Sequence, residues 1–554
     1  MKKLRIALPV AISLVALGFS VWRVPAVPAQ IRIPSEAIES VAELNAVIQR
    51  GMELEKNRRW SELVTLYEDA LKKHPNTKHI KKSLTRAKTH YDIQRRHADR
   101  SFRQTINRLT RGQALELYAE ILQKISANYV QPPDWQKLVN RGVDHLHVAM
   151  GDGSFAKHYM KGVTPQRKKQ FKTDLANRLK RFRVRNRYDA RQVAGWTAQL
   201  ADQQLGIPQV ATILEFACGA SNSLDLYSCF LTASQLEEVF SQIEGNFVGL
   251  GIEIKSKNQE LEVVNVLRGS PALEAGIRTG DTIIQVADSS TRRDGTEAAA
   301  DKLKGPAGTT VQLIVRNLSG DVRTLKVLRR EIELPSITDV KMVDRANGIA
   351  YLKLNSFQKT TAKDLEQAMW KMHRKGMRCL IMDLRGNPGG LLPASVTIAD
   401  KFIARGGIVS TRGRSAQEDY DYQAHRIGTW RVGLVVLIDG DSASASEILA
   451  GAVQDHRRAT IVGRQSYGKG SVQGIFRLTT SRCGIRLTTA KFYSPNGTAI
   501  SRRGIVPDVV VHKVRKAPIR AKTEVVSIPR RPQAVEDAIL KAGIDAARAK
   551  VARK

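Results

Sequence analysis

The spacing of hydrophobic positions changes along this chain. Between residues 34 and 244 they recur every three to four positions, as in "ALELYAEILQKI", which predicts amphipathic helices. Residues 245 to 332 alternate short β-branched runs with glycine turns, a pattern typical of a small β-rich module. From 333 to 515, the strand-like runs "GIAYLKLNSF", "CLIMDLRGNPGG" and "VGLVVLIDG" alternate with helical patterns. This alternation indicates an α/β layer, so the chain is predicted to be a multidomain α+β protein.

The N-terminal helical region, residues 34 to 100, contains one stretch whose apolar spacing is typical of a helix-turn-helix repeat. "GMELEKNRRWSELVTLYEDALKKHP" resembles a tetratricopeptide unit, whose inward face would hold Trp60, Leu63, Tyr67 and Ala70. One such unit is too short to bury its own apolar face, so a generic helical hairpin fits equally well. The second helical region, residues 101 to 244, shows no pattern of catalytic chemistry.

Cysteine and histidine spacing predicts no metal site. The four cysteines are Cys218, Cys229, Cys379 and Cys483; they form no C-x-x-C pair, and a Cys218 to Cys229 bridge stays open. His145 and His147 form an H-x-H pair without a third ligand at suitable spacing, so we expect both at the surface.

Length and charge narrow the class of protein. With 554 residues, of which 42% are hydrophobic, the chain can build several separate cores. A formal net charge of +36 gives a field that attracts nucleic acid, anionic lipid or acidic polymer without specific contacts. A solvated basic surface is the simpler interpretation of the same number.

The first 29 residues have the pattern of an export signal. A positive start is followed by an apolar run over residues 6–22, and the small residues Val27 and Ala29 offer a cleavage site before Gln30. The run is as long as a short spanning helix, so an uncleaved membrane anchor is the alternative. Either interpretation predicts an exported protein of the periplasm or cell envelope. Nucleic acid is then not expected as a partner, and contact with a membrane surface stays open.

The β-rich module resembles a PDZ domain. The resemblance rests on the run Gly249, Leu250, Gly251 and Ile252, and on the block "SPALEAGIRTGD", residues 270–281. It implies that the glycine loop binds a peptide carboxylate through backbone N–H groups and that the following strand pairs with the peptide. A glycine-rich hairpin without a ligand is the plainer alternative.

The stretch "GDSASASEI" has two interpretations. Ser444 and Glu447 fit S-x-x-E, the capping box that closes a helix start. The same place, a turn from strand to helix, also suits a nucleophile, because free N–H groups there stabilise an oxyanion. The local pattern leaves both open.

Lys469 lies between two glycines in "GRQSYGKGSVQ". The G-x-x-x-x-G-K spacing suggests a phosphate loop, but Gly470 replaces the metal-binding hydroxyl and a strand pattern follows, so we exclude a nucleotide site. Flanking glycines let the backbone approach closely and turn the amine inward, where burial lowers its pKa and makes it a general base. A Ser-His-Asp triad is the competitor, with His373, His425, His456 and His512 available, none in a pattern that marks a base.

Together these blocks resemble the carboxyl-terminal processing proteases, serine peptidases of the S41 family. The similarity spans residues 224 to 511 and includes "LDLYSCFLT", "DLRGNPGG", "SASASEILAGAVQD", "VGRQSYGKGSVQ" and "LTTAKFYSPNGTAISRRGIVPDVVV". It implies a ClpP/crotonase-like core with Ser444 as nucleophile, Lys469 as base and Gln473 orienting the lysine. It also implies an oxyanion hole formed by the N–H groups of Gly389 and Ala445. Leu226 stands where the family usually has proline.

The resemblance implies a serine endopeptidase that cleaves exported proteins at or near their C-terminal tails, with no cofactor. Its partners would be unfolded or tagged protein C-termini, recognised by the PDZ domain, while an activating adaptor or self-association stays open. Two other classes remain. One is a non-catalytic envelope scaffold of PDZ and repeat-like helices; the other is an envelope-binding protein whose charge is its main function. Residues 516 to 554 are predicted to be a basic tail with a last short helix.

Overall fold

The computed structural model describes residues 35–74, 77–294, 296–425, 427–512 and 537–553. It divides into one unit up to Lys88 and a second unit from Thr89 onward. The predicted signal peptide or anchor, residues 1–29, lies outside the described residues. Within the part of the chain that is described, no helix combines the length and the apolar character needed to span a bilayer.

The first unit is a set of helices around the predicted apolar face. Trp60, Leu63, Tyr67 and Ala70 are all buried, which confirms that face. The helices pack closely, because a Cβ atom at Gly51 would lie 2.3 Å from the Tyr67 hydroxyl oxygen. The elements are α1 (Ser35–Lys56), α2 (Trp60–Lys73) and the first part of α3 (Lys78–Ala98).

The second unit begins with a helical bundle. Polar residues start many of its helices: the side chains of Thr110, Asp134, Asp152, Thr164 and Asn186 each accept a hydrogen bond from a backbone N–H of the first turn. Helix α10 is buried on all sides over residues 210–221 and forms the centre of the bundle. The elements are α4 (Arg100–Arg108), α5 (Arg111–Asn128), α6 (Trp135–Ala149), α7 (Gly153–Tyr159), α8 (Pro165–Lys180), α9 (Arg187–Leu205) and α10 (Gln209–Asn222).

The prediction of a surface position is wrong for His145. Its side chain is 5% exposed, and its Nδ1 lies 2.9 Å from Oε2 of Glu215, which is fully buried. Glu215 also accepts hydrogen bonds from Arg96 and His97. Burial raises the pKa of Glu215, but the Arg96 charge and the two imidazole hydrogen bonds outweigh it and hold that pKa well below its usual range. The open question of a disulfide is also answered, since Cys218 and Cys229 are both free thiols.

The strands β2 and β9, which enter and leave the PDZ module, pair with each other as a two-stranded antiparallel sheet. Its main sheet has the order β3-β4-β5-β7-β8, so β3 is an edge strand, and β6 pairs with β5. Ser270 caps a short helix, and Gly280 and Asp281 end the turn before β5. The elements, after β1 (Cys229–Leu231) and α11 (Ala233–Glu244), are β2 (Asn246–Gly249), β3 (Ile252–Lys257), β4 (Glu260–Val266), α12 (Pro271–Glu274), β5 (Thr282–Val286), β6 (Ser289–Ser290), α13 (Thr291–Asp294), α14 (Thr296–Leu303), β7 (Thr310–Arg316), β8 (Val322–Leu328) and β9 (Arg330–Glu333).

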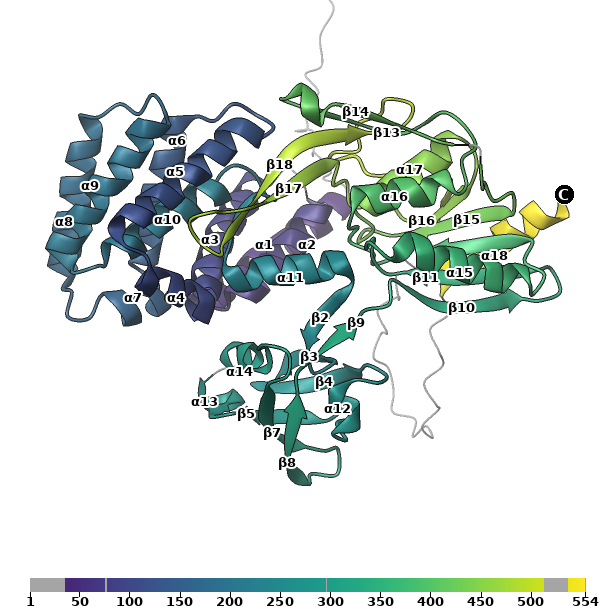
Figure 1. Cartoon of the computed structure of the whole chain (residues 1–554), viewed down its shortest axis with the longest axis horizontal. Coiled ribbons are helices and arrows are strands. Elements are labelled where there is room, and N and C mark those ends of the chain that lie inside the picture. The colour runs from purple at the N-terminus through teal and green to yellow at the C-terminus, as the bar shows by residue number, and fades with distance from the viewer. Residues whose placement is uncertain (1–34, 75–76, 295, 426, 513–536, 554) are drawn as a thin grey trace, which may run out of the picture. The chain divides into compact units, whose positions relative to one another are not determined.

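The last part of the chain forms the predicted α/β layer, whose sheet has the order β10-β11-β12-β15-β16-β19 (Figure 1). All neighbouring pairs except β10 with β11 are parallel. The three strand-like runs of the sequence analysis become β11, β12 and β15, all buried, which confirms them. The elements are β10 (Ile337–Asp344), β11 (Ile349–Leu354), α15 (Thr361–His373), β12 (Cys379–Asp383), α16 (Leu392–Asp400), β15 (Gly433–Ile438), α17 (Ala445–Asp455), β16 (Thr460–Gly463) and β19 (Val509–Val510).

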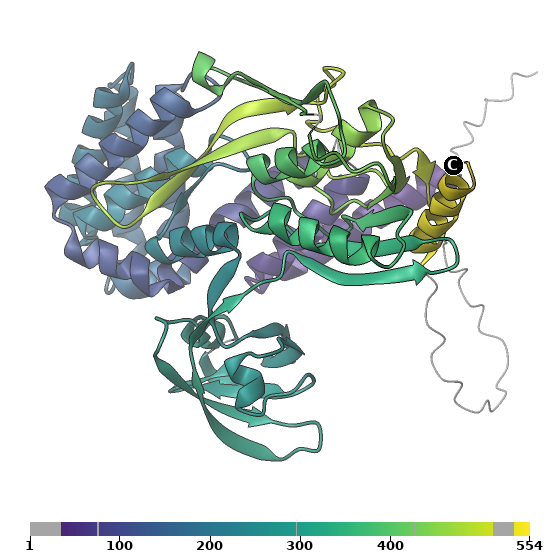
Figure 2. The ribbon, with the colours of Figure 1, turned by 45° about the vertical axis from the view of Figure 1, so that its right-hand side comes forward.

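A second sheet links the layer to the helical bundle. Its order is β1-β18-β13-β14, and β17 pairs with β18 as a long hairpin that reaches from the layer to the bundle in both views (Figures 1 and 2). Leu478, Cys483, Ile485 and Leu487 of this hairpin belong to the same apolar core as the bundle helices. The elements are β13 (Gly407–Gly413), η1 (Ala416–Glu418), β14 (Tyr420–Gln423), β17 (Ser471–Arg477) and β18 (Gly484–Tyr493).

The last short helix is α18 (Ala538–Ala552), and it belongs to the α/β layer. Ile539, Ala547 and Val551 are buried in one cluster with strands β11, β12, β15 and β16. A Cβ atom at Gly543 would lie 2.7 Å from Leu437, so the helix packs tightly on the sheet. The basic segment thus ends in an element of the core.

Candidate active site

The alternating serines lie where β15 turns into α17, with Ser446 already in the first turn of the helix, and they make different contacts. Ser442 and Ser446 are fully buried; their hydroxyls donate to the backbone oxygens of Leu384 and Asn387, at 2.8 Å and 3.1 Å. These bonds tie the turn to the loop after β12. Ser444, between them, is partly exposed.

Ser444 adopts a strained backbone conformation. Its φ of 57° and ψ of −114° lie in a region that residues with a Cβ atom rarely occupy. Such strain is common where a nucleophile is presented on a sharp strand-to-helix turn. The capping interpretation also holds in part, because the Ser444 N–H donates to Oε2 of Glu447 at 2.8 Å.

Glu447 joins the two candidate catalytic residues. Its side chain is fully buried in α17, and its Oε2 accepts from the N–H of Ser444 and, at 2.9 Å, from the N–H of Lys469. Its Oε1 accepts from the Ser466 hydroxyl and the Gly468 N–H, both at 2.6 Å. One carboxylate thus fixes the serine turn against the glycine-rich loop, and the two backbone nitrogens lie within two hydrogen-bond lengths of each other.

The glycines around Lys469 are needed for close packing, as the sequence predicts. Gly468 has a φ of +87°, and a Cβ atom there would lie 3.1 Å from the backbone of Arg502. At Gly470 a Cβ atom would lie 2.2 Å from the Ser501 nitrogen. The loop is therefore pressed against residues 501–502, and only glycine fits on either side of the lysine.

The Lys469 amine lies in a partly buried setting. Its Nζ is 5.1 Å from the centre of the Tyr227 ring. Burial lowers the pKa of Lys469, and the charge of Arg486 lowers it further, while Glu447 and Asp225 act in the opposite direction. The net shift favours the neutral amine, which a general base requires.

Two predicted site residues have other hydrogen-bond partners in this structure. The Gln473 amide donates to the backbone oxygen and the hydroxyl of Ser471, both at 2.9 Å. The Gly389 N–H donates to Oδ1 of Asn387 at 2.8 Å. Gly389 is nevertheless in direct contact with the serine, since a Cβ atom there would lie 2.8 Å from Cβ of Ser444. The Ala445 N–H, at the first position of α17, has no hydrogen-bond acceptor among the described residues.

The glycine loop of the PDZ module has the geometry of an anion-binding turn. Within the described residues, the N–H groups of Leu250 and Gly251 have no acceptor, and Leu250 is buried. Gly251 has a φ of +79°, and a Cβ atom there would lie 2.2 Å from Cβ of Ser270. Gly249 ends β2, and Ile252 opens the edge strand β3.

The competing histidines are engaged elsewhere. His373 packs edge-on against Trp370 and Trp430. His425 pairs with Asp400, and Nε2 of His456 donates to the Gly407 oxygen at 2.7 Å. His512 is exposed just after β19.

The sequence analysis missed two residues of this site. Glu447 was considered only as a capping partner, and its bond to Lys469 joins residues 22 positions apart. Tyr227 lies in the quoted block "LDLYSCFLT", which gave the only signal, yet no local pattern places its ring beside the amine. Glu447 and Tyr227 contact Lys469 across the fold, and such contacts between distant positions cannot be predicted from a single sequence.

Known proteins resemble this chain over its second half. The model of "Peptidase family S41" matches residues 348–511, and that of the PDZ domain matches residues 238–316. A carboxy-terminal-processing protease of Bartonella bacilliformis is 38% identical over 320 residues, covering 56% of this chain and 72% of that protein. One of Picosynechococcus is 37% identical over 293 residues, covering 52% and 70%. Among solved structures, the photosystem II D1 C-terminal processing protease is 24% identical, with a TM-score of 0.38 over 72% of this chain and 93% of that one.

Proposed function

The chain belongs to the S41 family of carboxy-terminal-processing serine proteases, and on that premise we propose that Ser444 and Lys469 form its catalytic dyad. The observation that most supports this is that one oxygen of the Glu447 carboxylate, Oε2, accepts hydrogen bonds from the backbone N–H groups of both residues. The lowered pKa of Lys469 adds to it, because a lower pKa increases the fraction of uncharged amine that can accept a proton.

In the proposed reaction, neutral Lys469 takes the proton of the Ser444 hydroxyl as its oxygen attacks the carbonyl carbon of a peptide bond. The resulting ammonium gives its proton to the leaving amine, and an acyl-enzyme remains. Water, deprotonated by the same amine, then hydrolyses the ester and releases the acid.

The Ala445 N–H is the first donor to the oxyanion, because it is free at a helix start. Gly389 is the second donor. Its N–H must leave Oδ1 of Asn387 before it can donate to an oxyanion, so substrate binding would reorient this peptide group. Gln473 would hold the lysine through its neighbour Ser471.

The PDZ module would recognise the substrate tail. Free N–H groups at Leu250 and Gly251 suit a C-terminal carboxylate, and the open edge of β3 suits pairing with an extended peptide. The substrates would be unfolded or tagged C-terminal tails of exported proteins, in the periplasm or cell envelope.

The test is cleavage of an unfolded reporter with an apolar C-terminal tail. We expect Ser444→Ala and Lys469→Ala each to reduce kcat by about a thousandfold or more, with unchanged thermal unfolding. Lys491→Ala, at an exposed lysine of β18, is the matched control and should retain activity. Equal rates in the wild type and both variants would disprove the dyad, and an inactive wild type would favour a binding protein or one that needs an activator.

A further inference from the structure

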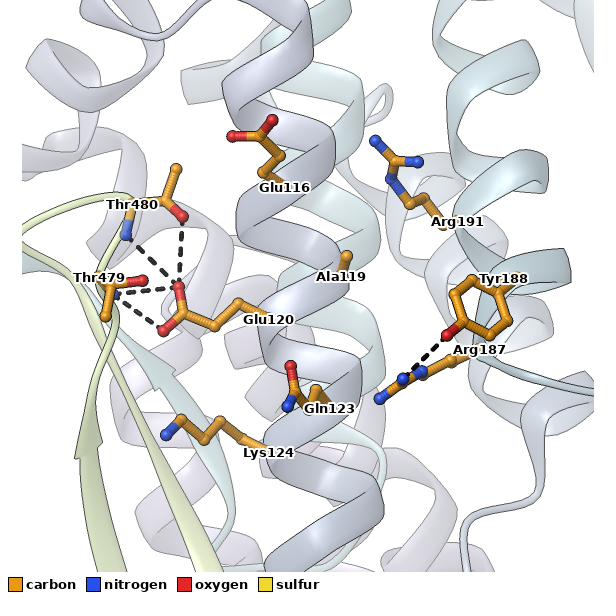
Figure 3. A pocket seen from close by; sticks show the side chains of 10 residues that line it. All are labelled: Glu116, Ala119, Glu120, Gln123, Lys124, Arg187, Tyr188, Arg191, Thr479 and Thr480. Atoms are coloured by element: carbon orange, nitrogen blue, oxygen red, sulfur yellow. Dashed lines mark hydrogen bonds between the residues drawn. The ribbon is translucent and has the colours of Figure 1, made fainter.

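Two adjoining hollows lie on the helical bundle, lined by none of the candidate catalytic residues. The first, of about 450 Å³, lies between α5, the start of α9 and the tip of the β17–β18 hairpin, as Figure 3 shows. The second, of about 350 Å³, lies between α5, α8 and α9. Tyr188 and Arg191 line both, so the two hollows form one groove.

The charged residues that line the second hollow are all basic. Arg111, Arg178 and Arg191 line it, and its lining includes no carboxylate. Arg178 packs over the Trp196 ring at 4.4 Å, and Nε of Arg191 donates to the Leu115 oxygen at 3.3 Å. Among the described residues, none of these three guanidinium groups has a carboxylate partner. Each keeps N–H donors for a ligand, and carboxylates and phosphates both match guanidinium geometry.

The aromatic and amide groups of the hollow favour a polypeptide. Tyr188, which is exposed, and Trp196, which is 9% exposed, line the hollow beside the arginines, together with Gln192 and Gln199. Tryptophan, tyrosine and arginine are the residues that contribute most often to binding energy at protein interfaces. We propose that the groove is a docking site for an acidic segment of a partner protein, with aspartate or glutamate side chains bound by Arg111, Arg178 and Arg191.

The first hollow continues the groove to the hairpin. Its lining has mixed charge: Glu116, Glu120 and Lys124 lie along α5, and Arg187 and Arg191 lie on the neighbouring α9 (Figure 3). Glu120 accepts from the N–H groups of Thr479 and Thr480 at the hairpin tip. A docked segment would thus contact the hairpin whose first strand carries Gln473. That consequence for activity rests on the proposed function, whereas the binding itself does not.

The test is direct binding to the full chain in the Ser444→Ala background, so that a probe is not cut. The probe is a fluorescein-labelled dodecapeptide with six glutamates and one central tryptophan, followed by fluorescence anisotropy. We expect saturable binding that weakens with salt, and a loss of about tenfold or more in the triple variant Arg111→Gln, Arg178→Gln, Arg191→Gln.

The matched control is Arg167→Gln, Arg181→Gln, Arg183→Gln, which removes the same charge from exposed positions of the same bundle outside the groove. It should change affinity less than twofold, and thermal unfolding of both variants must match the parent protein. Equal losses in both triples would overturn the proposal in favour of a diffuse basic field. Absence of peptide binding would overturn the proposal as well. So would binding of phosphatidylglycerol vesicles that depends on the groove arginines, if the peptide does not bind there.

Discussion

Two fully buried glutamates lie in different parts of this protein and have opposite pKa shifts. Glu447, in the candidate active site, accepts only from neutral donors, namely three backbone N–H groups and one hydroxyl. Burial outweighs these bonds and raises the pKa of Glu447. Glu215, in the helical bundle, binds one guanidinium and two imidazoles, and its pKa lies well below the usual range.

The difference in pKa shift distinguishes a carboxylate that stabilises the fold, Glu215, from one that positions neighbouring backbone groups, Glu447. A full positive charge compensates the cost of burying a carboxylate, so Glu215 stabilises the bundle in its ionised form. Dipoles compensate that cost only in part, so Glu447 is held at an energetic disadvantage where it orients Ser444 and Lys469. Perturbed groups of this second kind are common at functional sites. The two carboxylates should therefore respond differently to the same substitution.

The largest effect expected is loss of stability in Glu215→Gln. The change leaves the buried Arg96 charge with Asp92 as its remaining carboxylate partner, and we expect the free energy of unfolding to fall by roughly 3 kcal/mol. Urea unfolding measures it, and peptidase activity per folded molecule should not change. A loss below about 1 kcal/mol would show that the cluster is not held by charge.

The cluster formed by Glu215, Arg96 and His97 should also make the stability of the protein depend on pH. His97 has a pKa lowered by burial, so wild-type stability should begin to fall as the pH drops below about 6.5, the unfolded value for histidine. The contribution of Glu215 is present above about pH 4.3, the unfolded value for glutamate, and is lost as the pH falls through its lowered folded pKa. Urea unfolding at a series of pH values measures both. A flat profile between pH 7 and pH 5 would contradict the assignment for His97.

Glu447→Gln should act on catalysis more than on stability. The amide cannot accept from all four donors, so the serine turn and the lysine loop lose their shared anchor, and we expect kcat to fall roughly a hundredfold. The change also removes a charge that raises the pKa of Lys469, so the rising limb of the pH–rate profile should move to lower pH. A purely structural role would lower the rate without moving that limb.

Arg486→Gln should shift the same limb in the opposite direction. The Arg486 charge lowers the pKa of Lys469, so its removal raises that pKa, and the neutral amine forms only at higher pH. The pH dependence of kcat/KM measures the shift. Arg486→Lys, which keeps the charge, is the control and should leave the limb in place; a shift of equal size in both variants would refute the electrostatic account.

The smallest effect expected is at the hairpin tip. Glu120 is partly exposed, and Glu120→Gln weakens its bonds to Thr479 and Thr480, which should cost about 0.5–1.5 kcal/mol in the free energy of unfolding. Glu116→Gln, one helical turn earlier and exposed, is the control and should change stability by less. Equal values for the two variants would show that the tip is not anchored by Glu120.

Much of the site could be predicted because its signals are local. The strand-like runs became β11, β12 and β15, since continuous apolar residues fix a buried strand without reference to distant partners. The glycines around Lys469 indicated close backbone packing, which residues 501–502 provide. Serine at a strand-to-helix turn indicated two candidate roles, capping and presentation of a hydroxyl; the Ser444 N–H bond to Glu447 fits the first and the strained backbone fits the second.

Other features lie beyond any local pattern, because their partners come from distant parts of the chain. The bonds from Arg96 and His145 to Glu215 span 119 and 70 positions, so the lack of a third metal ligand near the H-x-H pair led to a surface position for His145 that is wrong. The packing of α18 depends on a match between its apolar face and the open face of a sheet built elsewhere.

The sequence by itself determined the family and the order of the PDZ and S41 regions, and it indicated the candidate groups of the site, since motif spacing and hydrophobic period are properties of neighbouring residues. Only the tertiary structure decided which buried carboxylate meets charges and which meets dipoles, where the Gly389 N–H and the Gln473 amide point, and which arginines share a groove. These depend on the surroundings that folding assembles, and the free energy of a buried polar group is set by those surroundings.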